Sequence, residues 1–101
     1  MPGRELEVHP EALAEARAAY VWYRERSQAA AAAFVDELDR SIQRIVEVPE
    51  RWPVYAAGTR RFLLRRFPFF VVYRINPATI EILAVAHGRR RPGYWKERKD
   101  K

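Results

Sequence analysis

Cysteine is absent from the chain, histidine occurs twice and glycine only four times. Without cysteine the protein has no disulfide bond, no thiol nucleophile and no thiolate metal site. The two histidines, His9 and His87, are too far apart in sequence for a His-x-x-x-His metal pattern, and there is no glycine-rich loop of the kind that cradles phosphates. The sequence therefore predicts neither a metal nor another cofactor.

Long apolar runs are also lacking. A membrane-spanning helix needs about 20 consecutive apolar residues, and no run in this chain approaches that length. The first ten residues, MPGRELEVHP, lack the apolar core of a signal peptide. We therefore expect a protein that is not exported, makes no contact with a membrane and works in the cytoplasm. A length of 101 residues suffices for one hydrophobic core, so residues 1–101 are expected to form a single domain.

Positive charge is concentrated in the second part of the chain. Residues 1–59 carry 7 Lys and Arg against 10 Asp and Glu, a balance of −3. Residues 60–101 carry 12 against 3, a balance of +9, and the two balances sum to the net charge of +6. Such an asymmetry favours an anionic partner, which is either a nucleic acid or an acidic protein segment.

The first elements expected along the chain are a short strand and a helix. ELEV, residues 5–8, alternates polar and apolar side chains, which predicts a strand with Leu6 and Val8 facing inward. Pro10 suits the first turn of a helix, which we expect to end near Arg26. The apolar face predicted for this helix consists of Leu13, Ala16, Tyr20 and Tyr23.

A second, longer helix is expected after Ser27, a residue type that favours the N-cap position, and Pro49 ends it. Five consecutive alanines at positions 29–33 have high helix propensity and little bulk, so the two helices can approach closely as an antiparallel hairpin. The apolar stripe predicted for the second helix consists of Ala31, Phe34, Leu38, Ile42 and Ile45.

The period of the apolar residues changes after the loop PERWPVYAAGT. RRFLLRRF (60–67), FFVVYRI (69–75) and TIEILAVA (79–86) are rich in β-branched and aromatic residues and are separated by Pro68 and Asn76-Pro77. They predict three antiparallel strands in a meander, with the helical hairpin covering one side of the last two. The predicted fold class is α+β: one N-terminal strand, a two-helix antiparallel hairpin and a three-stranded meander in one sheet.

The segment HGRRRPGYW, residues 87–95, follows the last predicted strand and allows several readings. His87 is either a structural histidine at a strand end, a catalytic base or a partner contact. The three arginines after it form either a solvated turn or a surface that binds an anion or another target. Tyr94 and Trp95 form either a C-terminal lid packed on the sheet or a stacking platform.

The order of these elements, together with PERWP, RRFLLRRFPFFVVYRI and IEILAVAHGRRRPGYWKER, resembles the RelE/ParE superfamily of toxins from type II toxin–antitoxin systems. The resemblance covers roughly residues 4–98. It implies a RelE/ParE-like fold and growth inhibition relieved by a cognate antitoxin. It also implies one of two activities, because RelE-like members cut mRNA on the ribosome and ParE-like members, the plasmid stabilisation type, inhibit DNA gyrase.

The residues at the positions of the nuclease site favour the ParE-like activity. The resemblance places Arg89 at a phosphate-binding arginine and Trp95 near a catalytic tyrosine, whereas Phe70 stands where those nucleases carry a second catalytic arginine. A phenylalanine cannot stabilise a phosphorane. If the chain is nevertheless a metal-independent mRNA endonuclease, its catalytic candidates are Arg89, His87, Arg66 and Tyr94.

The leading hypothesis is therefore a non-enzymatic toxin that binds a protein target such as DNA gyrase. The alternatives are a RelE-like nuclease acting on the ribosome and a plain nucleic-acid-binding module. On the toxin readings, DNA is contacted only through the complex with the antitoxin. The residues predicted to bind the target or an anion are Arg61, Arg65, Arg89, Arg90, Arg91 and Trp95, and those predicted to bind the antitoxin are Trp22, Trp52 and Phe62.

Overall fold

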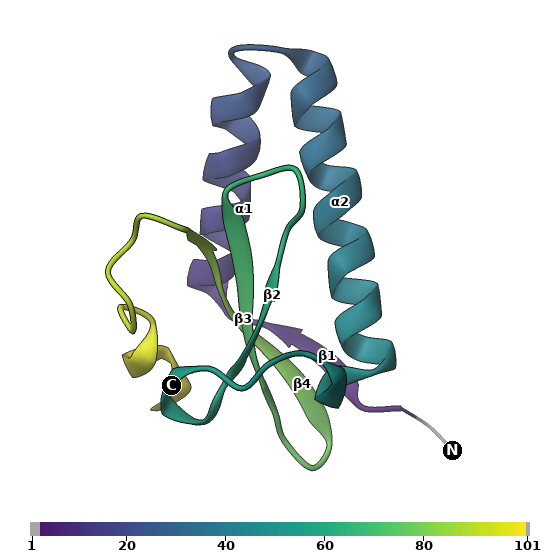
Figure 1. Cartoon of the computed structure of the whole chain (residues 1–101), viewed down its shortest axis with the longest axis vertical. Helices are drawn as coiled ribbons and strands as arrows, with labels where there is room; N and C mark the ends of the chain where they lie inside the picture. Colours follow the sequence, from purple (N-terminus) through teal and green to yellow (C-terminus); the bar gives the residue numbers. More distant parts are fainter. Residues whose placement is uncertain (1–2, 101) are drawn as a thin grey trace.

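A computed structural model describes residues 3–100 and contains two helices and four strands (Figure 1). Three short 3-10 turns, at Pro49–Arg51, Ala56–Gly58 and Lys96–Asp100, complete the secondary structure of these residues. The helices and strands are, in chain order, β1 (Glu5–Val8), α1 (Pro10–Arg24), α2 (Gln28–Glu47), β2 (Arg60–Leu63), β3 (Phe69–Ile75) and β4 (Thr79–His87).

The predicted helical hairpin is confirmed. The Ser27 hydroxyl accepts a hydrogen bond from the Ala30 N–H at 3.1 Å, which caps α2, and Pro49 begins a 3-10 turn just after that helix. The first helix ends at Arg24, two residues earlier than expected. The predicted stripe of α2 faces the core, with Ala31, Phe34, Leu38 and Ile45 buried and Ile42 partly buried against them.

The face predicted for α1 is partly wrong. Leu13 is 56% exposed, whereas Ala12 and Ala19 are buried. Ala16 and Tyr23 do pack on the core, as expected. The small alanine side chains let α1 lie close to the sheet, and this turns the helix so that the bulky Leu13 points to solvent. A pattern based on large apolar residues could not detect a buried face made mainly of alanine.

The sheet has the order β1-β4-β3-β2, and its last three strands form the predicted antiparallel meander. β1 lies at the edge and pairs with β4 in parallel, from Glu5 opposite Thr79 to Val8 opposite Ile82. Leu6 and Val8 are both exposed, so the expectation that they face inward is wrong. β1 has a neighbouring strand on one side only, which is consistent with the exposure of these side chains.

β2 ends at Leu63 rather than extending to Phe67 as predicted. The backbone N–H groups of Arg65 and Arg66 donate to the carboxylate of Glu37 on α2, so they do not take part in strand pairing. An unpaired backbone donor in this position would cost free energy. The carboxylate therefore fixes where the strand stops and directs the chain toward α2.

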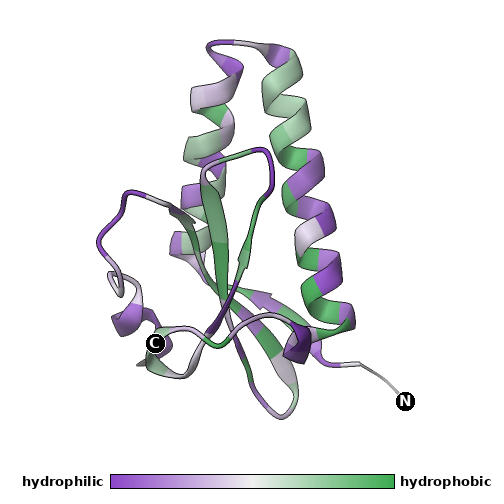
Figure 2. Ribbon diagram, in the orientation of Figure 1, coloured by the Kyte–Doolittle hydropathy of each residue, from purple (hydrophilic) through white to green (hydrophobic). Residues whose placement is uncertain are grey.

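The two faces of the sheet are covered by different parts of the chain. The helical hairpin packs on one face, against Val71, Tyr73 and Ile82, and the turn end of the hairpin extends beyond the turn between β2 and β3 (Figure 1). On the other face Trp95 packs fully buried against Val72, Leu83, Ala84 and Ala86. In Figure 2 β3 and β4 are mostly green, whereas the edge strand β1 and the turn after β4 are mostly purple. The α+β fold class is confirmed.

Candidate functional site

The face of the sheet opposite the helices carries Phe70, the residue on which the sequence-based choice between the two activities rests. Phe70 on β3 meets the ring of Tyr55 edge-on, with the ring centroids 5.8 Å apart. The guanidinium of Arg61 lies 4.4 Å from the centroid of the Tyr55 ring and 5.3 Å from that of Phe70. These cation–π contacts hold the Arg61 guanidinium over the two aromatic rings. Phe70 itself has neither a proton nor a charge to give to a reaction.

Trp95 belongs to the core of this same face. Its side chain is fully buried and lies 5.8 Å from the Tyr55 ring centroid. The prediction that Trp95 contacts a target is therefore wrong for the folded chain, because no surface of the indole is free to touch one. Trp95 instead belongs to a C-terminal lid packed on the sheet, which was the alternative expectation for this residue.

His87 is the last residue of β4 and is held by the turn that follows it. Its Nδ1 accepts a hydrogen bond from the N–H of Arg89 at 3.0 Å, and its ring lies edge-on to Phe69 with centroids 5.1 Å apart. The acceptor role of Nδ1 leaves Nε2 as the nitrogen that carries the proton in the neutral ring. Arg90 lies over the Tyr94 ring at 3.8 Å, while Arg89 and Arg91 are exposed.

A carboxylate on α1 joins the C-terminal segment to the edge of β4. Glu15 accepts hydrogen bonds from the Val85 N–H at 3.0 Å, from the Tyr94 hydroxyl at 2.7 Å and from both terminal nitrogens of Arg98 at 2.9 and 3.0 Å. Arg98 also donates to the Leu83 carbonyl at 2.9 Å. Burial and the bond to Glu15 raise the pKa of Tyr94 above its ordinary value. The hydroxyl of Tyr94 thus serves to hold the C-terminal segment in place.

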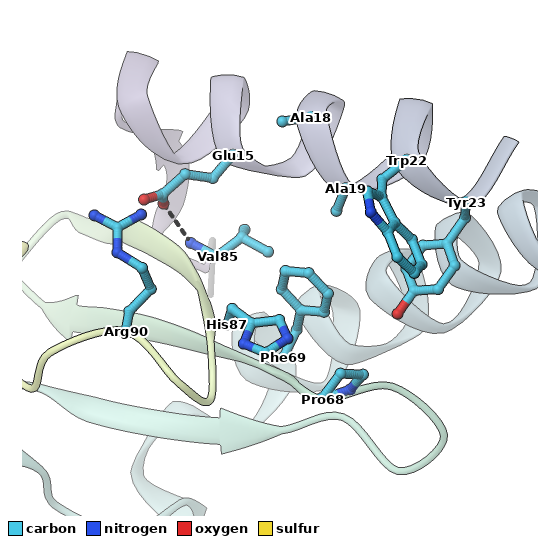
Figure 3. Close-up of a pocket in the computed structure, with 10 residues that line it drawn as sticks. All are labelled: Glu15, Ala18, Ala19, Trp22, Tyr23, Pro68, Phe69, Val85, His87 and Arg90. Carbon is cyan, nitrogen blue, oxygen red and sulfur yellow. Dashed lines mark hydrogen bonds between the residues drawn. The ribbon is translucent and has the colours of Figure 1, made fainter. Parts of the chain in front are cut away.

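A first groove, here called the α1 groove, lies between α1 and the ends of β3 and β4 and has a volume of about 400 Å³ (Figure 3). Trp22 at its rim is 50% exposed, and the guanidinium of Arg26 lies 3.6 Å from the centroid of its ring. The lining is mainly apolar, with charge supplied by Glu15 and Arg90. The residues of the α1 groove are Glu15, Ala18, Ala19, Trp22, Tyr23, Pro68, Phe69, Val85, His87 and Arg90.

A second groove, here called the α2 groove, lies between α2 and the segment that follows β2 and has a volume of about 590 Å³. Arg66 forms a 3.0 Å ion pair with Glu37, whose side chain is only 11% exposed. Burial acts to raise the pKa of Glu37, but the hydrogen bonds from Arg65 and Arg66 outweigh it and hold this pKa below its ordinary value. The residues of the α2 groove are Glu37, Arg40, Ser41, Arg44, Phe62, Arg65 and Arg66.

The catalytic candidates do not all line one hollow, although Tyr94 contacts Glu15 and Arg90, which line the α1 groove with His87. His87 lines the α1 groove, Arg66 lines the α2 groove, and Tyr94 lines a third, smaller hollow with Glu11 and Arg98. Arg89 is exposed on the turn after His87. General acid–base chemistry on one phosphodiester needs its groups within hydrogen-bond reach of the same reacting atoms.

The three residues predicted to bind the antitoxin occupy two regions. Trp22 borders the α1 groove, whereas Phe62 lines the α2 groove and packs against Trp52, with ring centroids 4.5 Å apart. Trp52 and Phe62 are both partly buried. The partner contacts predicted for these residues remain expectations, and Trp22 offers the largest free surface of the three.

Five residues that shape these sites were not predicted from the sequence: Glu15, Glu37, Arg40, Arg44 and Arg98. Glu15 and Arg98 are 83 positions apart, so no local pattern links them. Arg40 and Arg44 did carry a signal, because arginines four positions apart on a helix share one face. Their neighbours across the groove are set by the three-dimensional fold.

The described residues hold no cluster of three or more His, Asp or Glu side chains that would bind a metal ion. None of the described helices combines the length and the apolar character that a membrane span requires.

Two helices packed on a mixed four-stranded sheet, with a groove beside each helix, define a small α+β domain. The model of the family described as "ParE toxin of type II toxin-antitoxin system, parDE" matches residues 6–92, so the chain belongs to the ParE toxin family. The predicted superfamily and its ParE branch are thereby confirmed.

Among solved structures, the chain is similar to one described as the chromosomal ParDE TA system from P. aeruginosa. The TM-score is 0.74, and the 23% identity extends over 83% of this chain and 95% of that chain. At this level of identity the likeness establishes the fold. No curated protein matches the chain in sequence.

Proposed function

We propose that this ParE toxin stops growth by binding DNA gyrase, without cleaving RNA, and that a cognate antitoxin neutralises it. The residue that carries the proposal is Phe70, which rests against Tyr55 and which the resemblance to the superfamily aligns with an arginine of the RelE-like nucleases. The placement of Arg66 in the α2 groove, whereas His87 lines the α1 groove, supports the same conclusion. The action of the protein on gyrase would take place in the cytoplasm.

The surface that we assign to the target is the turn after β4. Arg89 and Arg91 are exposed there, and neither forms an ion pair with another described residue. Free guanidinium groups form strong, directional hydrogen bonds with carboxylates. Arg61, whose guanidinium lies 4.4 Å from the centroid of the Tyr55 ring, extends this basic character toward β2.

The surface that we assign to the antitoxin is the α1 groove with the projecting end of the hairpin. Val21 and Trp22 on α1 and Val35 on α2 are exposed, and the turn end of the hairpin extends past the sheet (Figure 1). An amphipathic segment binds such a groove through apolar anchors. Acidic residues beside those anchors would face Arg90 and the basic turn, which adds charge complementarity. The solved ParDE structure that this chain resembles is itself described as a toxin–antitoxin system.

The proposal is tested by regulated expression of the chain with separate measurements of DNA synthesis and of protein synthesis. We expect DNA synthesis to fall first, and primer extension on cellular mRNA to show no cuts at codon positions. The His87→Ala variant should arrest growth as the wild type does, because the His87 ring takes no part in binding the target. Coexpression of the antitoxin should restore growth in both cases.

A nuclease gives the opposite pattern. Protein synthesis would stop first, and mRNA cuts made by the wild type would vanish with His87→Ala at equal levels of folded protein. That outcome would overturn the gyrase proposal and identify His87 as a catalytic residue.

A further inference from the structure

The α2 groove has cationic side chains on two walls. Arg40 and Arg44 are one helical turn apart on α2 and therefore lie on one face, with their Cβ atoms about 5–6 Å apart. Arg65 and Arg66 belong to the segment after β2 and line the groove as well. A linear anion lying along the groove would thus have guanidinium groups on two sides.

Most of this charge is free. Glu37 is the only carboxylate among the lining residues, and it is already bound by Arg66 and by the backbone N–H groups of Arg65 and Arg66. Arg40, Arg44 and Arg65 form no ion pair with any described residue. Four arginines and one glutamate leave the lining a net charge of +3 (4 − 1).

The groove offers little apolar surface. Phe62 is its only large apolar side chain, and part of the Phe62 ring is covered by Trp52 at 4.5 Å between centroids. An acidic protein segment needs apolar anchors here, because an exposed ion pair contributes only about 0–1 kcal/mol. A nucleic acid strand gains affinity differently, by releasing the counterions condensed on its phosphates. A basic groove with one aromatic residue is also the arrangement found where single strands bind.

We propose that the α2 groove binds a single nucleic acid strand through its phosphodiester backbone. Arg40, Arg44 and Arg65 would form charge-assisted hydrogen bonds with successive phosphates, and Phe62 would contact a sugar or base between them. The groove is separate from the face that carries Phe70 and from the α1 groove. The proposal therefore does not depend on whether gyrase or the ribosome is the target.

The test is fluorescence anisotropy with a fluorescein-labelled 12-nucleotide oligothymidylate and with an oligouridylate of the same length. The groove variant Arg40→Gln/Arg44→Gln is compared with the control Arg17→Gln/Arg24→Gln, which removes the same charge from exposed positions on α1. Circular dichroism checks that both variants are folded. The conservative variant Arg40→Lys/Arg44→Lys keeps the charge and should retain most of the binding.

We expect the groove variant to bind about tenfold or more weakly than the wild type and the control to bind almost normally. The slope of log affinity against log salt should fall by about 1.4 in the groove variant, because each phosphate contact on a single strand contributes about 0.7. A preference for one of the two oligonucleotides would identify the natural ligand as DNA or RNA.

Three results would overturn the proposal. In the first, the wild type fails to bind either oligonucleotide. In the second, the groove variant and the Arg17→Gln/Arg24→Gln control weaken binding equally, which would mean that binding depends only on net charge. In the third, polyglutamate of matched charge displaces the oligonucleotide at equal or lower concentration, and the groove is then a site for an acidic protein.

Discussion

The α1 groove and the α2 groove are both lined in part by the segment that connects β2 to β3, yet one groove is mainly apolar and the other is strongly basic. Pro68 lines the first and Arg65 and Arg66 line the second. The α1 groove is mainly apolar and has an exposed tryptophan, whereas the α2 groove has four arginines and one large apolar side chain. The net charge of the chain therefore describes neither surface well. The α1 groove suits a protein segment, and the α2 groove suits a polyanion.

Both grooves depend on the packing of α2, so the largest effect is expected from a charge in its buried stripe. Leu38→Asp places a carboxylate at a buried position among core residues. Burying an unpaired charge costs several kcal/mol, comparable with the net stability of about 5–15 kcal/mol of a typical domain. We expect the variant to be unfolded by circular dichroism and nontoxic. Val35→Asp, at an exposed position on the same helix, is the matched control and should remain folded.

The second largest effect separates the two grooves. Arg98→Ala removes the guanidinium that pairs with Glu15, whose side chain is only 16% exposed. Breaking a buried pair costs about 3–5 kcal/mol, which chemical denaturation would measure. Because Glu15 lines the α1 groove, antitoxin binding should weaken while oligonucleotide binding in the α2 groove changes little. If the exposed control Arg91→Ala lowers the free energy of unfolding as much as Arg98→Ala does, the pair of Arg98 with Glu15 does not account for the loss of stability.

A smaller loss of stability is expected from a change in the α2 groove. Glu37→Gln keeps the size of the side chain but weakens its bonds to Arg65 and Arg66, and we expect a loss of about 1–3 kcal/mol at neutral pH. The pKa of Glu37 is lowered in the folded state, so its contribution is present above the ordinary carboxyl pKa of 4.5 and is lost as the pH falls through the folded value. Denaturation from pH 7 to pH 3 should therefore show the wild type and the variant converging in acid. If the difference in the free energy of unfolding stays constant over this pH range, the effect does not arise from the ionised Glu37 carboxylate.

The smallest effect on stability is expected at the rim of the α1 groove. Trp22→Ala removes a half-exposed ring stacked on Arg26, which costs about 0.5–1 kcal/mol of folding free energy. The same change should weaken antitoxin binding about 30-fold, the loss of about 2 kcal/mol typical of a tryptophan anchor. Calorimetric titration with the antitoxin measures this. Val54→Ala, exposed outside both grooves, is the control, and equal affinities for the two variants would exclude Trp22 from the interface.

The features predicted correctly from the sequence are those with local signals. Ser27 caps a helix by bonding its own first turn, Pro49 cannot continue that helix, and Asn76-Pro77 forms a turn between two strands. These effects act within a few residues, so they are visible in a short stretch of sequence.

The errors concern features set by distant contacts. β2 does not continue to Phe67 because the Glu37 carboxylate from α2 accepts the N–H groups of Arg65 and Arg66. Trp95 is buried because its segment folds back over the far face of the sheet. The outward-facing Leu6 follows from the edge position of β1, which strand periodicity does not specify. The candidate catalytic residues were predicted individually, but only the fold shows that Arg66 and His87 line different grooves and that Tyr94 is bound to Glu15.

The most direct test of the central claim is supercoiling of relaxed plasmid by purified DNA gyrase in the presence of the folded chain. We predict inhibition that the antitoxin relieves, equal inhibition by His87→Ala, and weaker inhibition by Arg89→Gln/Arg91→Gln, which lacks two charges of the exposed turn. The account is contradicted if gyrase is fully active at every concentration of toxin while the same preparation cuts ribosome-bound mRNA.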